Sequence, residues 1–233
     1  MKKVFISRQP APPASAGLAR PGRRVSPACA QPALAGGRLW LIFLFLLLTG
    51  CGVKNDISQP KNDMPTAKIL MVVAPRDFRD VEYNEPRKIF EEAGAQVKVA
   101  SIQTGTATGA EGTKVNIDLI ASEARPEDFD AVAFIGGPGM LEIINDETLE
   151  ILARKFYAED KITAAICVAP AILAQAGVLQ GKNATAWSGV RETLEKNGAS
   201  FLNQAVVADG KIITAEGPVA AREFGEEIVK ALQ

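Results

Sequence analysis

The chain has 233 residues, of which 47% are apolar and 23% charged, and these values are ordinary for one sizeable globular domain plus a targeting segment. The formal net charge of −1 is unevenly distributed. Residues 1–50 hold seven basic and no acidic side chains, which leaves 19 of the 26 basic and all 27 acidic residues to the rest of the chain. This acidic remainder argues against nucleic-acid binding, which needs a basic face.

The first 50 residues have the pattern of a signal peptide. Residues 1–38 are rich in Pro, Ala, Gly and Arg and show no apolar periodicity, which is typical of disorder. Residues 39–48 form an uncharged apolar block that is short for a membrane span and has the length of the apolar region of a signal peptide. The alternative is a signal anchor followed by an incidental cysteine.

A cysteine follows this apolar block at once. The run LTGC from Leu48 to Cys51 resembles the lipobox of bacterial lipoproteins, which implies cleavage before Cys51 and a diacylglycerol on its sulfur. Residues 51–66 are polar, contain two prolines and are predicted to form a flexible tether. Gly52 is not an aspartate, which by resemblance to Gram-negative sorting favours the outer membrane. We therefore expect a protein anchored through a lipid to the periplasmic face of a cell-envelope membrane.

The folded domain is predicted to span residues 67–233, where strand and helix patterns alternate. Short apolar runs predict buried strands at 68–74, 96–100, 130–135, 162–166 and 183–187. Helices are predicted at 81–94, 146–158, 169–176, 189–197 and 219–232. Turn signals predict a hairpin or loop at 105–115 and a hairpin at 205–214. This alternation predicts an α/β fold with a mostly parallel sheet covered on both faces.

Cys167 stands between a predicted strand and a predicted helix. Pro170 falls in the first turn of that helix, where the missing N–H costs little, and Gly177 suits the helix end. A cysteine in this position faces the positive end of the helix dipole, which stabilises a thiolate. The same strand–nucleophile–helix elbow presents the nucleophile of α/β-hydrolases. The alternative is a small buried apolar residue, because free cysteine is among the most buried residue types.

Four stretches, in this order, resemble motifs of the ThiJ/PfpI (DJ-one) family. They are FRDVE at 78–82, GGPG at 136–139, AAICVAP at 164–170 and DGKIITAEGP at 209–218. The resemblance covers about residues 67–233. It implies a flavodoxin-like three-layer sandwich related to class I glutamine amidotransferases, and it implies a homodimer.

The resemblance also implies roles for site residues. Cys167 corresponds to the family's nucleophile and Glu82 to the acidic residue that hydrogen-bonds its sulfur. Burial keeps such an acid neutral, and a protonated acid stabilises a thiolate, so we expect a thiol pKa below its ordinary value. Backbone N–H groups of Gly136, Gly137 and Val168 are expected to form an oxyanion hole. The alternatives are a solvated glutamate in a first helical turn and a plain strand-end turn.

The chain departs from the family because it contains no histidine. Val168 stands where protease-like members carry a histidine, and Trp187 and Ser188 stand where other members carry one. A Cys–His pair is therefore impossible within the chain or across a homodimer, which argues against peptidase activity. Glu216 stands where the DJ-one branch carries an arginine. General acid–base work is left to Glu82.

Other kinds of site find little support in the sequence. Without histidine, and with one mature thiol besides Cys51, no metal site is expected, and no cofactor is expected either. The glycine-rich run 136–139 lacks the Lys and Ser/Thr of a phosphate loop. Trp187 and Phe134 are expected in the core rather than as stacking platforms.

Three functions stay open. In the first, Cys167 adds to a small-molecule substrate, an aldehyde or related reactive carbonyl, and Glu82 shuttles the proton, as in a glyoxalase or deglycase. In the second, the protein is a redox sensor or protects against oxidative stress, and Cys167 is oxidised to sulfenic or sulfinic acid. In the third, a binding module kept the fold and lost the chemistry.

Overall fold

The computed structural model describes residues 66–233. The predicted signal segment, the tether as far as residue 65 and the expected lipidation of Cys51 lie outside the described residues. Within residues 66–233, no helix combines the length and the apolar character needed to cross a membrane.

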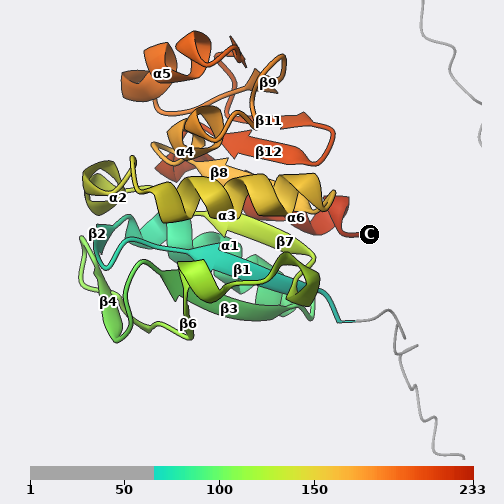
Figure 1. The fold of residues 1–233 in the computed structure, drawn as a ribbon. Helices are drawn as coiled ribbons and strands as arrows, with labels where there is room; N and C mark the ends of the chain where they lie inside the picture. The colour runs from blue at the N-terminus through green and yellow to red at the C-terminus, as the bar shows by residue number, and fades with distance from the viewer. Residues whose placement is uncertain (1–65) are drawn as a thin grey trace, which may run out of the picture. The chain divides into compact units, whose positions relative to one another are not determined.

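A seven-stranded sheet forms the centre of the described domain (Figure 1). In spatial order its strands are β11 (Val206–Asp209), β12 (Ile212–Ala215), β8 (Ile162–Ile166), β7 (Ala131–Phe134), β1 (Lys68–Val72), β3 (Gln96–Ser101) and β6 (Leu119–Ile120). Every neighbouring pair is parallel except the edge hairpin β11–β12. The predicted strands at the centre of the sheet are confirmed, and they are apolar along their length because both faces are covered.

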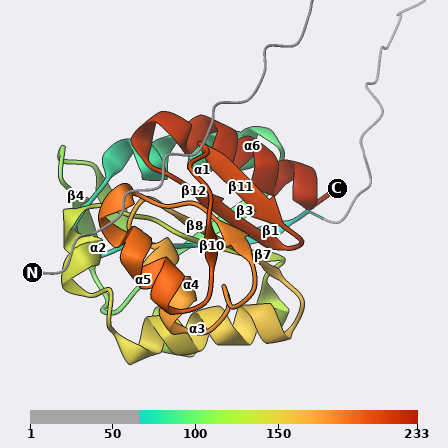
Figure 2. The same cartoon turned by 90° about the horizontal axis from the view of Figure 1, so that it is seen from above.

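Helices cover both faces of this sheet, as the view from above shows (Figure 2). α1 (Asp80–Glu92) and α6 (Ala221–Ala231) pack on one face, and α3 (Glu147–Ala158) and α4 (Pro170–Gln175) on the other. Successive side chains of β1 alternate between the two cores, so Leu70 belongs to the α3 side and Met71 to the α1 side. This is the predicted flavodoxin-like three-layer sandwich.

The short elements agree only in part with the sequence prediction. The segment 105–115, predicted as a hairpin or loop, is a hairpin of β4 (Thr106–Gly109) and β5 (Lys114–Asn116), but β2 (Arg76–Phe78), which pairs with β4, was not predicted. The predicted strand 183–187 shortens to β9 (Asn183–Ala184), which pairs with β10 (Ser200–Phe201) outside the main sheet.

The remaining differences concern short helices. A helix that was not predicted, α2, follows the glycine-rich turn, and the predicted helix 189–197 divides into η3 and α5. The short helices are α2 (Pro138–Glu142), α5 (Arg191–Lys196), η1 (Ala121–Glu123), η2 (Pro126–Asp128), η3 (Ser188–Val190) and η4 (Pro218–Ala220). Each spans six residues or fewer, so it carries little of the periodicity on which sequence prediction depends.

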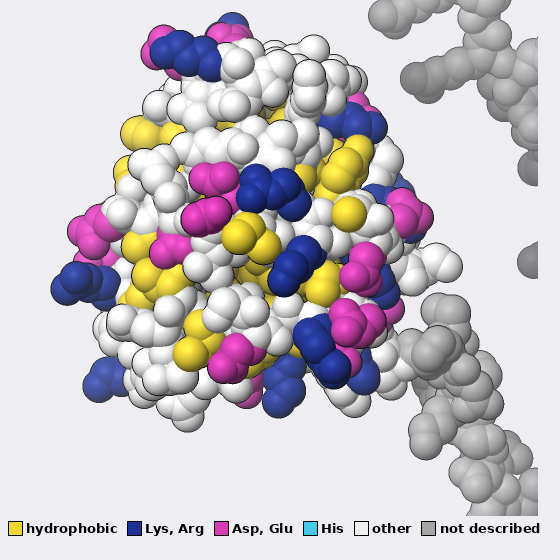
Figure 3. Space-filling view, in the orientation of Figure 1, with side chains coloured by type: hydrophobic (Ala, Val, Ile, Leu, Met, Phe, Trp, Pro, Cys, Tyr) yellow, Lys and Arg dark blue, Asp and Glu magenta, His cyan; other side chains and the backbone are white. Residues whose placement is uncertain are grey.

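Acidic and basic side chains are intermingled on the face of the domain seen in Figure 3. Elsewhere on the helices, many pair one turn apart, as Arg191 does with Glu195 at 2.8 Å and Arg222 with Glu226 at 2.9 Å. Exposed pairs of this kind each contribute a few tenths of a kcal/mol. The face seen in Figure 3 therefore offers no continuous basic patch for a polyanion.

Candidate active site

The carboxyl ends of parallel strands meet at one edge of a sheet, and this edge assembles the candidate site. The turn after β1 leads through β2 into α1, the turn after β7 carries Gly136 and Gly137, and the turn after β8 carries Cys167. All four stretches that carried the family resemblance meet here, because Ala215 of the fourth accepts a hydrogen bond from Cys167 N–H and Pro218 lines the same cavity as the thiol. Glu82 and Cys167 are far apart in the sequence, and the pairing of β1, β7 and β8 brings them together.

Cys167 has the predicted position between β8 and the helix α4. Its φ of 65° lies in the left-handed region, which costs a non-glycine residue about 1–2 kcal/mol. Two backbone hydrogen bonds hold this conformation, because the Cys167 N–H donates to Ala215 O at 2.9 Å and Trp187 N–H donates to Cys167 O at 2.8 Å. The strained backbone turns the thiol away from the strand direction and places it at the wall of a cavity.

Glu82 is the third residue of α1 and is completely buried. Its Oε2 accepts a hydrogen bond from Gly136 N–H at 3.1 Å. Its Oε1 is buried without a partner of good hydrogen-bond geometry, and the thiol of Cys167 is the polar side chain with which the carboxyl group interacts. The predicted Glu82–Cys167 contact is therefore present, and the solvated-glutamate alternative does not fit.

Gly136 makes this contact possible. A Cβ atom at position 136 would lie 2.6 Å from both Cys167 Cβ and Glu82 Oε2, and 2.8 Å from Ile166 O. Gly137 has a φ of 117°, and a Cβ there would overlap the backbone of residues 77–79. The two glycines therefore let the chain pass between the acid and the thiol.

Only two of the three N–H groups that were expected to form an oxyanion hole remain available for it. Gly136 N–H already donates to Glu82, so this donor serves the carboxyl group rather than an oxyanion. The N–H groups of Gly137 and Val168 are directed at the thiol and lower its pKa. A carbonyl oxygen bound beside the sulfur would find its donors in these two groups, which stays a prediction.

Burial dominates the electrostatics of the acid. It raises the pKa of Glu82 from 4.5 to about 7, although the thiol of Cys167, the charge of Arg79 and Gly136 N–H each lower it. The acid therefore changes protonation near neutral pH, which suits a residue that both accepts and donates a proton.

The thiol does not behave as the sequence predicted. Burial and the neighbouring Glu82 carboxylate raise the pKa of Cys167 to about 12, and the Val168 and Gly137 N–H groups offset this only in part. The expected depression of the thiol pKa is therefore wrong for the state in which Glu82 is ionised. α4 has only six residues, so its dipole acts through little more than one turn. The two groups share one negative charge and titrate as a pair.

A cavity of about 370 Å³ opens onto the thiol. It is lined by Arg79, Gly137, Pro138, Leu141, Cys167, Val168, Trp187 and Pro218. Trp187 is 46% exposed, so its predicted place in the core is wrong, whereas Phe134 is fully buried as predicted. A Cβ at position 189 would overlap the indole, so Gly189 allows the ring to lie over η3.

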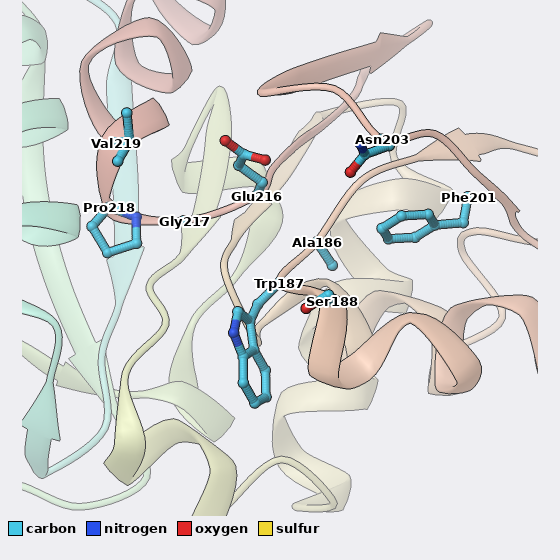
Figure 4. Close-up of a pocket in the computed structure, with 9 residues that line it drawn as sticks. All are labelled: Ala186, Trp187, Ser188, Phe201, Asn203, Glu216, Gly217, Pro218 and Val219. Carbon is cyan, nitrogen blue, oxygen red and sulfur yellow. The ribbon is translucent and has the colours of Figure 1, made fainter.

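A second cavity of about 290 Å³ shares Trp187 and Pro218 with the first (Figure 4). Glu216, Asn203 and Phe201 contribute to its wall. Glu216 is exposed and does not line the Cys167 cavity, so the acidic residue that replaces the arginine of the DJ-one branch does not add a charge beside the thiol.

Three residues that line the Cys167 cavity were given no role from the sequence, namely Arg79, Leu141 and Pro218. Arg79 lies inside the FRDVE stretch, at the N-cap of α1, and its place directly before Asp80 and Val81 in a site motif was the available signal. Leu141 belongs to α2, which the sequence did not predict. Pro218 begins η4, and its place at the end of the DGKIITAEGP stretch was the available signal.

Comparisons with known proteins agree with this fold. The chain matches the profile of the DJ-1/PfpI family over residues 67–231. An uncharacterized protein of Methanocaldococcus jannaschii is 38% identical over 199 residues, which cover 84% of this chain and 97% of that protein. A Pyrococcus furiosus protein named deglycase PfpI is 36% identical over 167 residues, covering 71% of this chain and 99% of the relative. A Pyrococcus horikoshii deglycase is 34% identical over 166 residues, with 71% and 99% covered.

Solved structures show the same architecture. A ThiJ/PfpI domain protein from Brachyspira murdochii is 38% identical and superposes with a TM-score of 0.70, covering 72% of this chain and 96% of that one. Drosophila melanogaster DJ-1beta is 28% identical, with a TM-score of 0.66 and coverage of 72% and 91%. With a family profile matched across the whole described sandwich, and relatives above 30% identity aligned over nearly their full length, the chain belongs to the DJ-1/PfpI family.

Proposed function

We propose that this protein is a cysteine-dependent enzyme for small reactive carbonyl compounds, with chemistry of the deglycase or glyoxalase type. The observation that carries the proposal is the contact of a buried carboxyl group, Glu82, with the Cys167 thiol at the wall of an open cavity. Two Pyrococcus relatives, 34% and 36% identical, are named deglycases, which supports the same class of substrate.

The first step is addition of the thiol to a carbonyl group. The Cys167 S–H proton moves to the Glu82 carboxylate as the S–C bond forms, and the π electrons of the carbonyl move to its oxygen. The N–H groups of Gly137 and Val168 are placed to stabilise this oxyanion. Glu82 then returns the proton to the oxygen, which gives a neutral hemithioacetal. A pKa of about 7 for Glu82 suits both transfers at neutral pH.

A 2-oxoaldehyde can continue from this intermediate without another catalytic group. Glu82 removes the C–H proton of the hemithioacetal and returns it to the adjacent carbon through an enediol, which leaves a thioester on Cys167. Water then cleaves the thioester to a 2-hydroxy acid and restores the thiol. The net reaction consumes one water and requires no redox partner. A cavity of about 370 Å³ suits a substrate of this size.

The test is conversion of methylglyoxal to lactate by the wild type, Cys167→Ser and Glu82→Gln. We expect Cys167→Ser to fall to the uncatalysed rate, and Glu82→Gln to lose roughly 10²- to 10⁴-fold, the usual contribution of a positioned acid–base group. Glu159→Gln is the control, because Glu159 is an exposed carboxylate at the C-cap of α3. Full activity in Cys167→Ser would rule out the proposed mechanism.

A second candidate function is oxidation sensing, and one observation favours it. Cys167 is the one free cysteine among the described residues and is partly exposed, so within residues 66–233 it has no thiol with which to form a disulfide. Peroxide would therefore carry it through sulfenic to sulfinic acid. Intact-mass measurement after peroxide treatment should show a gain of two oxygens at Cys167. A thiol that stays reduced would remove this candidate.

A further inference from the structure

Arg79 places a positive charge on the wall of the Cys167 cavity. Of the eight described residues that line this cavity, Arg79 alone carries a charged side chain, and the others are apolar residues, Gly137 and the cysteine itself. Glu216, the nearest acidic residue in the lining of the adjoining cavity, belongs to that second cavity only. The surface that meets a substrate beside the thiol therefore combines apolar walls with one cation.

The guanidinium of Arg79 is only weakly neutralised. Two carboxyl groups face it. Glu111 Oε1 lies 3.7 Å from its Nη1 and belongs to a side chain that is 62% exposed, so solvent screens this pair. The buried Glu82 is the other, and its proton is shared with the thiol. Arg79 Nε is itself buried, so the terminal part of the side chain is what a ligand in the cavity can reach. The positive charge of Arg79 is thus left for a ligand.

We infer that Arg79 makes the Cys167 cavity selective for carbonyl compounds that carry a carboxylate, with the carboxylate on the guanidinium and the carbonyl carbon at the sulfur. The inference rests on the proposed function, which supplies the carbonyl chemistry, and it names the substrate class. Guanidinium groups bind carboxylates through paired N–H donors, and the apolar walls formed by Leu141 and Trp187 reduce competition from water.

The fold allows Arg79 to be replaced. Arg79 is the N-cap residue of α1, but its side chain makes no capping hydrogen bond, and its backbone N–H, not its side chain, donates to Gly136 O at 3.0 Å. Arg79→Gln and Arg79→Lys should therefore fold as the wild type does. Arg76→Gln is a matched control, because Arg76 is an arginine three residues earlier whose side chain is 77% exposed and lines a different cavity.

The experiment compares two thiol reagents of nearly equal size, iodoacetate and iodoacetamide, on the full chain at pH 7.5. Peptide mass spectrometry follows the modification of Cys167 alone. Removing Arg79 alters the thiol pKa for both reagents equally, so the ratio of their rates isolates the effect of reagent charge. We expect Arg79→Gln to lower the iodoacetate/iodoacetamide ratio roughly fivefold to tenfold, the Coulomb effect of one nearby charge in a partly screened site. Arg79→Lys should restore most of the wild-type ratio, and high salt should lower the ratio measured for the wild type.

A ratio unchanged in Arg79→Gln, or lowered equally in Arg76→Gln, would overturn the inference. Measurement of catalytic turnover distinguishes failure of this inference from failure of the proposed function. 4,5-Dioxopentanoate and methylglyoxal are both 2-oxoaldehydes, and only 4,5-dioxopentanoate carries a carboxylate, so the wild type should prefer 4,5-dioxopentanoate and Arg79→Gln should lose that preference. Loss of the alkylation ratio in Arg79→Gln together with no turnover of either aldehyde would support the anion site and contradict the enzyme proposal.

Discussion

Glu82 is buried and Cys167 is partly exposed, and the charge of Glu82 makes ionisation of the thiol more difficult. The carboxyl group has a pKa of about 7 and the thiol one of about 12 when Glu82 is charged. Removal of one proton from the pair leaves a charge that either group can carry, and a second removal must overcome repulsion between two anions. Above about pH 7 the residue pair therefore holds one proton, which is the property that a proton shuttle needs.

The first prediction concerns stability and follows from the raised pKa of Glu82. Because the folded-state pKa lies above the unfolded value of 4.5, the acid contributes stability below pH 4.5, and this contribution is lost as the pH rises through about 7. The loss amounts to ~3 kcal/mol. Glu82→Gln retains an acceptor for Gly136 N–H and cannot ionise, so it should not show this loss.

Urea denaturation of both proteins at pH 4.5 and pH 8 checks this prediction. The difference in unfolding free energy between Glu82→Gln and wild type should shift in favour of the variant by ~3 kcal/mol on going to pH 8. A constant difference between the two proteins at both pH values would show that Glu82 ionises as an exposed acid does.

At the scale of elements, a buried side chain of α1 holds the turn of the β4–β5 hairpin. Asp80, the first residue of α1, is buried and accepts hydrogen bonds from Glu111 N–H and Thr113 N–H, both at 2.7 Å. Burial raises the pKa of Asp80, but these hydrogen bonds outweigh burial and lower it overall. The stability that Asp80 contributes is therefore present above its unfolded pKa and lost as the pH falls. The hairpin carries Glu111, which pairs with Arg79.

The second prediction is that Asp80→Ala releases this hairpin. Two partly buried hydrogen bonds are lost, which should cost about 1–3 kcal/mol and speed hydrogen exchange at Glu111 and Thr113. Asp146→Ala is the control, because Asp146 caps α3 by accepting from Thr148 N–H at 2.8 Å and lies in another element. It should cost about 1 kcal/mol and leave the hairpin amides protected. Equal exchange at Glu111 in both variants would be evidence against the role of Asp80.

The sequence predicted those elements whose pattern is strong over their own length. The strands β1, β7 and β8 are apolar because both of their faces are buried. This apolar pattern can be recognised in the sequence without knowing which strands pair with one another. The elements β2, α2 and β10 have two to five residues and form because other parts of the chain support them. Trp187 was misplaced for the same reason, since its exposure depends on η3 and on Gly189 beneath the ring.

The pairing of Glu82 with Cys167 was available only through the family resemblance, because 85 positions in sequence separate an acid in a helical turn from a cysteine at an elbow. Their burial could not be predicted from local pattern at all. Glu82 is buried by the sheet and by the passage of Gly136 against it, which are tertiary features. The error in the predicted thiol pKa follows from this, because desolvation is its largest cause.

At the scale of the whole molecule, one proposal concerns the quaternary state. We propose a homodimer, as the sequence resemblance implied. Val219 is 94% exposed and Leu141 42% exposed, so apolar side chains lie on the surface around the site and are available for a subunit contact. Light scattering on the purified protein at micromolar concentration should give twice the mass of the chain. A monomer under these conditions would refute the proposal.

The other proposal at this scale concerns anchoring. The LTGC run ending at Cys51 motivates it, and that run lies outside the described residues. We propose that the mature chain begins at Cys51 and carries a diacylglycerol there. Mass spectrometry of the membrane fraction should find the lipid on Cys51 and no residue before it. A Cys51→Ser variant should leave the membrane fraction, and an unmodified Cys51 still joined to Gly50 would contradict lipidation.

The proposed mechanism requires that Glu82 and Cys167 share one proton. The pH dependence of Cys167 alkylation by iodoacetamide tests this requirement directly. In the wild type the rate should rise through an inflection near pH 7, where the pair loses its first proton, and then level off. Glu82→Gln should remove that inflection and leave the single titration of an isolated thiol. A wild-type rate that rises only near pH ~8.5, the ordinary value for a cysteine, and is unchanged in Glu82→Gln would contradict the account.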